Sequence, residues 1–139
     1  DGINPVSLVA DIYSGAFGSG PRDLTLFNGK LYFRATEGPT GSELYEYDGI
    51  NPPILVADIR NGGNGSYPTE LTVLNGKLYF QADDGTHGPE LYEYDGINPP
   101  SLVADIRTDG YGSYPSYLAV FNNKLYFSAN DNVNGTELY

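Results

Sequence analysis

A fixed internal repeat restricts the fold of this chain more than any other feature of the sequence. The segment Asp-Gly-Ile-Asn begins at Asp1, Asp48 and Asp95, so the period is 47 residues. Within one unit, short apolar runs alternate with clusters of Gly, Asn, Asp and Pro, which is typical of strands joined by turns. In the second unit the predicted strands are Glu70–Leu74, Lys77–Ala82, Glu90–Tyr94 and Leu102–Ile106.

This period and strand number predict an all-β fold. A repeat of about 40 to 50 residues with four strands is the sequence signature of a β-propeller blade, a four-stranded antiparallel sheet. No segment carries the apolar stripe of a helix. We therefore expect a single repeat domain, 1–139, that comprises repeat 1 (1–47), repeat 2 (48–94) and repeat 3 (95–139).

The turns and strands inside each repeat agree with that prediction. Asn28-Gly29 and Asn75-Gly76 suit two-residue type I′ hairpins, which need positive φ at both central residues. The third repeat has Asn122-Asn123, and Asn tolerates the same region of φ. Strands such as Lys77–Ala82 are apolar on both faces, so each sheet is expected to pack between two neighbours.

The two ends of the chain hold complementary parts of one predicted blade. Ser7–Ile12 has the pattern of a fourth strand without its own first three, and the last repeat has only the first three. Propellers close with about four to eight blades, so three are too few. We expect strand completion between copies, with two chains giving six blades or three chains giving nine. The alternatives are a fragment of a longer repeat protein and an engineered chain.

Charge and composition exclude several classes of partner. The formal net charge is −11, which argues against nucleic-acid binding because phosphate backbones require a basic surface. The chain contains no Cys, so it has no disulfide and no thiolate metal site. No apolar run approaches the length of a membrane span, so no membrane insertion is expected.

Three segments resemble a known repeat family: Asn75–Gly88, Gly88–Gly96 and Leu102–Arg107. The sequence is similar to the repeats with a Glu-Leu-Trp-x-x-Asp-Gly-Thr consensus in large bacterial surface or secreted proteins. Tyr replaces the Trp, and Ile replaces the Thr, in the copies here. The resemblance implies a propeller-like fold and an extracellular or cell-surface location, and it implies no enzymatic activity. A looser similarity links the chain to kelch-type and lectin propellers.

Alternating chain direction places acidic residues on one rim of the predicted propeller. The loops between second and third strands lie on the same rim as those between successive sheets. Five candidate ligands for Ca²⁺ gather there, because hard cations prefer several oxygen ligands: Asp58, Asp84, Glu90, Asp105 and Asp131. The alternative is that these carboxylates accept N–H bonds and fix their own loops.

Aromatic residues in the loops of this rim suggest a carbohydrate site. Tyr67, Tyr111 and Tyr114 lie in glycine-rich loops, where an aromatic face and nearby polar groups suit a sugar. The alternative is that these tyrosines pack between sheets. The first repeat has Gly20 where the others have Tyr67 and Tyr114, so its site is expected to be absent or different.

The sequence offers little for catalysis. His87 is the only histidine, and its counterparts in the other repeats are Thr40 and Asn134, so no Ser-His-Asp set can be argued. We therefore predict that the chain is not an enzyme. The expected function is a non-catalytic scaffold or binding module that assembles with itself, and the alternatives are a glycan-binding lectin and a Ca²⁺-stabilised surface module.

Overall fold

The computed structural model describes residues 5–139, and this part of the chain is all-β with no helix. Eleven strands form three antiparallel sheets. The first contains β1 (Arg22–Phe27), β2 (Lys30–Glu37), β3 (Gly41–Tyr47) and β4 (Ile54–Ala57). The second contains β5 (Thr69–Leu74), β6 (Lys77–Asp83), β7 (Pro89–Tyr94) and β8 (Ser101–Ala104). The third contains β9 (Ser116–Phe121), β10 (Lys124–Asn130) and β11 (Thr136–Leu138).

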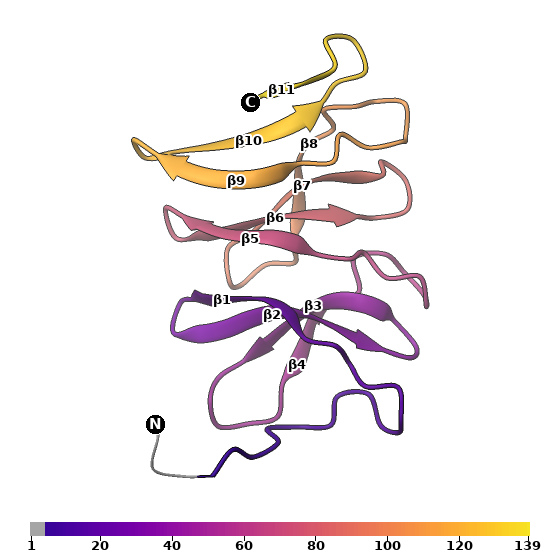
Figure 1. Cartoon of the computed structure of the whole chain (residues 1–139), viewed down its shortest axis with the longest axis vertical. Helices are drawn as coiled ribbons and strands as arrows, with labels where there is room; N and C mark the ends of the chain where they lie inside the picture. The colour runs from indigo at the N-terminus through magenta and orange to yellow at the C-terminus, as the bar shows by residue number, and fades with distance from the viewer. Residues whose placement is uncertain (1–4) are drawn as a thin grey trace.

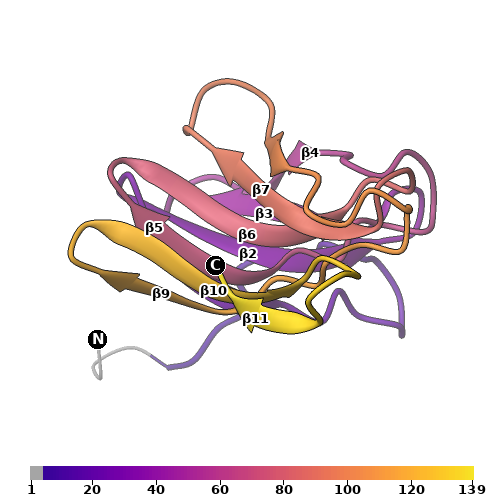
Figure 2. The same ribbon diagram turned by 90° about the horizontal axis from the view of Figure 1, so that it is seen from above.

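The three sheets lie one above another in chain order (Figure 1). In each sheet, successive strands are hydrogen-bonded neighbours, so the chain completes one sheet before it enters the next. Viewed from above, the sheets overlap, and the β5–β6 and β9–β10 hairpins lie at one end while the loops between sheets gather at the other (Figure 2). Among residues 5–139, no helix is long and apolar enough to span a membrane.

The strand predictions for the second repeat are confirmed, apart from the ends. Each of the four predicted strands is present, and the first three differ from the observed bounds by only one residue at an end. The predicted hairpin geometry is also confirmed, because φ is 50° at Asn75 and 74° at Gly76. Asn122 and Asn123 have φ of 48° and 59°, so the third repeat forms a similar turn without glycine.

The core lies between the sheets. Leu78, Phe80 and Ala82 on one face of β6 are fully buried against the first sheet. Tyr79, on the opposite face, packs against the cluster that contains Phe127 of the third sheet. The prediction that a strand with two apolar faces is covered on both sides is therefore correct for the middle sheet.

Two predicted strands differ from the structure. The fourth strand of the second repeat ends at Ala104 and not at Ile106, because the chain turns and the N–H groups of Ile106 and Arg107 point to Glu90. Ser7–Ile12 forms no strand in the single chain. Ile12 lies against a face of the first sheet, beside Phe33 and Tyr45, and not along a sheet edge where it would form a ladder. Residues 1–4 of the first repeat lie outside the described residues.

Candidate functional site

The loops at one end of the sheets meet in close backbone contact. A Cβ added to Gly41 would lie 2.5 Å from the nitrogen of Gly65, and one added to Gly88 would lie 2.6 Å from the nitrogen of Gly112. The loop between second and third strands therefore touches the loop that leads to the next sheet. This is the rim on which the sequence predicted the acidic and aromatic candidates.

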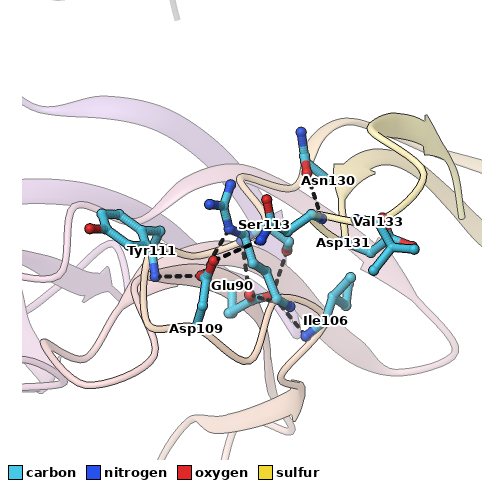
Figure 3. Close-up of polar contacts among 10 residues, drawn as sticks. Glu90, Ile106, Asp109, Tyr111, Ser113, Asn130, Asp131 and Val133 are labelled. Carbon is cyan, nitrogen blue, oxygen red and sulfur yellow. Dashed lines mark hydrogen bonds and ion pairs between the residues drawn. The ribbon is translucent and has the colours of Figure 1, made fainter.

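Two buried glutamates fasten these loops. Glu90 is the second residue of β7 and is fully buried. Its carboxylate accepts hydrogen bonds from the N–H of Ser113 at 2.8 Å, the Ser113 hydroxyl at 2.5 Å, and the N–H groups of Arg107 and Ile106 at 3.1 Å and 3.4 Å (Figure 3). Glu43 is also fully buried and makes the corresponding bonds to Ser66, Ile59 and Arg60.

Each serine in this arrangement joins two sheets. Ser113 donates to Glu90 of the second sheet, and its carbonyl accepts a bond of 2.9 Å from the N–H of Asn130 in the third. Ser66 similarly connects Glu43 to Asp83. Burial raises the pKa of both glutamates, while the serine hydrogen bonds act in the opposite direction. A carboxylate surrounded by four donors suits a structural role, because it satisfies backbone N–H groups that would otherwise be buried without acceptors.

Other predicted acidic residues cap their own loops. Asp84 accepts the N–H groups of Thr86 and His87 at 2.8 Å and 2.9 Å, and its second oxygen lies 2.7 Å from Nδ1 of His87. Burial raises the pKa of Asp84, but the hydrogen bonds from His87 and Thr86 outweigh it and lower the pKa to about 2. Asp131 makes equivalent bonds to Val133 and Asn134.

The pair formed by His87 and Asp84 predicts a pH effect on stability. The hydrogen bond to Asp84 raises the pKa of His87 above 6.5. A raised pKa in the folded state means that the stabilisation is complete below pH 6.5 and is lost as the pH rises through the folded value. His87→Asn introduces the residue that the third repeat has at the equivalent position, Asn134. Because an amide does not titrate in this range, the variant should lack this pH dependence. Urea unfolding at several pH values measures the pH dependence of the free energy of unfolding. The same pH dependence in parent and variant would contradict its assignment to His87 and Asp84.

The other two candidate calcium ligands, Asp58 and Asp105, do not form a cluster with Glu90, Asp84 and Asp131. Asp58 and Asp105 each have one buried oxygen, Oδ1, without a hydrogen-bond partner. Among residues 5–139, no three His, Cys, Asp or Glu side chains are close enough together to hold a metal ion. The oxygens of Glu90, Asp84 and Asp131 already accept bonds from their own loops. Calcium binding at this rim stays a prediction.

The three tyrosines predicted to contact sugar are exposed. Tyr67 and Tyr114 are 53% and 58% exposed, and Tyr111 is more exposed still and lies under the guanidinium of Arg107. In the single chain they therefore do not pack between sheets, which was the alternative. Tyr67 and Tyr114 also have positive φ, 51° and 53°, and Gly20 has φ of 53° at the same repeat position. A tyrosine in this region is strained, whereas a glycine is not.

Tyr67 borders a cleft of about 380 Å³. The cleft is also lined by aromatic residues of the N-terminal loop, Tyr13 and Phe17, and by two arginines, Arg22 and Arg34, which are its only charged lining residues. Arg22 and Arg34 face each other across β1 and β2. Neither forms an ion pair with another residue of 5–139.

Sequence reasoning missed the serines and the arginines. The serines carried a signal, because Ser19, Ser66 and Ser113 recur at the repeat period, as the glutamates do. The arginines carried none, because they do not recur. The second repeat has Thr69 and Gln81 in their places, which bond to each other, and the third has Ser116 and Ser128.

Comparison of the chain with protein-family models, with curated proteins and with solved structures finds no match.

Proposed function

We propose that this chain is a non-catalytic scaffold and binding module of the β-propeller type, in which each 47-residue repeat is a blade and further copies of the chain complete the ring. The observation that carries the proposal is the pair of buried glutamates, Glu43 and Glu90, which lie one repeat apart. Each fastens its sheet to the segment that enters the next. Sheets joined in the same way at every step are expected to continue around a ring.

The open face of the third sheet supports assembly. The middle sheet is covered on both sides, whereas the third sheet has none of the described residues beyond it on its outer face. Large exposed apolar side chains on such a face indicate a protein–protein interface. Propellers of about four to eight blades are the common range, so two chains with six blades are favoured over three chains with nine.

The mass of the particle in solution tests this proposal. Size-exclusion chromatography with light scattering, over a range of concentrations, should give the mass of two chains. Three chain masses would replace the six-blade ring with a nine-blade ring. One chain mass at all concentrations would contradict assembly by the 139-residue chain.

A specific observation favours a second function, the binding of glycans at the rim. Tyr67 keeps a strained φ and an exposed ring at the edge of the cleft, and strain of this kind is retained where the side chain has a use. A sugar ring packs well on an exposed aromatic face. Because Arg22 and Arg34 are the only charged residues of the cleft, we expect an acidic saccharide.

The substitution Tyr67→Gly should remove glycan binding and leave the stability of the fold almost unchanged. It copies Gly20, so the free energy of unfolding should stay within about 1 kcal/mol of the parent value, since the strain relieved and the backbone entropy gained by the unfolded chain offset each other. Binding of a uronic-acid oligosaccharide, measured by calorimetry, should be lost. Tyr111→Gly, outside this cleft, is the control. If the parent binds neither acidic nor neutral oligosaccharides, glycan binding is wrong.

A further inference from the structure

Before the first sheet, Ser19 presents hydrogen-bond donors that have no acceptor in the part of the chain that the structure describes. The carbonyl of Ser19 accepts the N–H of Thr36 at 2.8 Å, just as those of Ser66 and Ser113 accept from the sheets that follow them. The N–H and hydroxyl of Ser66 and Ser113 go to Glu43 and Glu90. In the structure, the N–H and hydroxyl of Ser19 bond to no acceptor among residues 5–139.

The last strand presents the matching acceptor. Glu137 occupies the repeat position of Glu43 and Glu90 but is exposed, and its carboxylate receives no hydrogen bond from residues 5–139. Glu90 accepts hydrogen bonds from Ile106, Arg107 and Ser113, which follow it in the chain. The equivalent donors for Glu137 would lie 47 residues after these three. In the 139-residue chain, the residues at the corresponding repeat positions are Ile12, Tyr13 and Ser19.

The apolar faces beside these groups are complementary. Phe121 and Leu138 on the outer face of the third sheet are 64% and 75% exposed, whereas their counterparts Phe27 and Leu44 are 3% and 0% exposed against the second sheet. Phe27 packs beside Tyr94 at a ring-centroid distance of 6.5 Å.

The residue corresponding to Tyr94 in the first repeat is Tyr47. It lines a groove of about 280 Å³ between the opposite side of the first sheet and the N-terminal segment, together with Leu31 and Phe33 of the sheet and Leu8 and Ile12 of the segment. The groove therefore has the lining that Phe121 of another copy requires.

We propose that Glu137 of one copy is buried against Ile12, Tyr13 and Ser19 of a second copy, which reproduces between chains the linkage that Glu43 and Glu90 make within one. The inference rests on the proposed assembly and names the residues that hold it. The occupant is a second copy of this chain because the donors, the acceptor and both apolar faces are repeat-related to a contact that is already formed twice within the chain. Ser19 then joins the third sheet of one copy to the first sheet of the other.

Removal of the carboxylate tests the proposal. Glu137→Ala should weaken assembly by about 100-fold or more, because several hydrogen bonds to a charged group are lost and their donors remain buried in the interface. Analytical ultracentrifugation over a dilution series measures the dissociation constant. Glu93→Ala, which removes an acidic side chain from a surface ion pair with Lys77, is the matched control and should change the constant little. Because Glu137 is exposed in the single chain, the far-UV circular dichroism of its variant should match that of the parent.

A double-mutant cycle shows whether the two residues act together. Ser19→Ala alone should weaken assembly by about tenfold, and adding it to Glu137→Ala should cause almost no further loss. If the two effects add in full, or if Glu137→Ala assembles as tightly as the parent, the linkage is wrong and the proposed assembly stands. If the parent chain is a monomer at every concentration, both the linkage and the assembly are wrong.

Discussion

Replacement of Glu90 with alanine is expected to lower the free energy of unfolding by about 3 to 5 kcal/mol, because the buried N–H of Ser113 and the partly buried N–H groups of Ile106 and Arg107 lose their acceptor. Urea unfolding at neutral pH, with all variants at one protein concentration, measures the loss. Glu90→Gln should recover only part of it, since an amide has one acceptor oxygen and its NH₂ group would face the donors.

The control for this substitution is on the same strand. Glu93 lies near the surface and pairs with Lys77 at 2.6 Å, so Glu93→Ala should cost less than about 1 kcal/mol. Equal losses for Glu90→Ala and Glu93→Ala would mean that the buried carboxylate does not hold the loop. The corresponding Glu43→Ala should behave as Glu90→Ala does.

Gly65→Ala is expected to destabilise the fold by about 3 kcal/mol or more, from positive φ and from steric overlap together. The φ of Gly65 is +70°, and an added Cβ would overlap the nitrogen of Ser42 and lie 2.7 Å from its oxygen. Both contacts are with backbone, so no side chain can move aside. The residue that follows is Ser66, which Glu43 holds, so the shift would also disturb that linkage.

Gly62→Ala provides a control with similar backbone geometry. The φ of Gly62 is +93°, and an added Cβ would meet nothing within 4 Å, so only the conformational cost of about 1 to 2 kcal/mol is expected. Thermal unfolding of both variants compares the two costs. A loss in Gly65→Ala no greater than in Gly62→Ala would contradict the close approach of the two loops.

Local signals predicted most of the sheet structure. The Asn75-Gly76 turn and the alternation of Leu78, Phe80 and Ala82 depend on neighbouring residues and on burial, and both are visible in a single repeat. The end of the fourth strand was wrong because it depends on a distant group. Ile106 leaves the ladder to donate to Glu90, which lies 16 residues earlier in the chain.

Strand topology predicted that these side chains lie at one end of the sheets, but it did not predict their hydrogen bonds or their exposure. Chain direction places Glu90 and Asp84 at this end, yet it does not distinguish a carboxylate that faces a cation from one that faces N–H groups. Tyr67 was a candidate for either contact with a ligand or packing between sheets. In the structure Tyr67 is exposed and has positive φ, and a tyrosine is not a residue from which positive φ can be predicted.

The linkage through Glu43 and Ser66 spans only 23 residues, and that through Glu90 and Ser113 spans the same distance. Each sheet is thus fastened to its immediate successor alone, so stability should accumulate by nearest-neighbour terms, as in linear repeat arrays. Such a chain can be lengthened or shortened by whole 47-residue repeats without any new kind of contact between sheets. Duplication of a single 47-residue segment would then add one further sheet, held to its neighbour by the same glutamate and serine contacts.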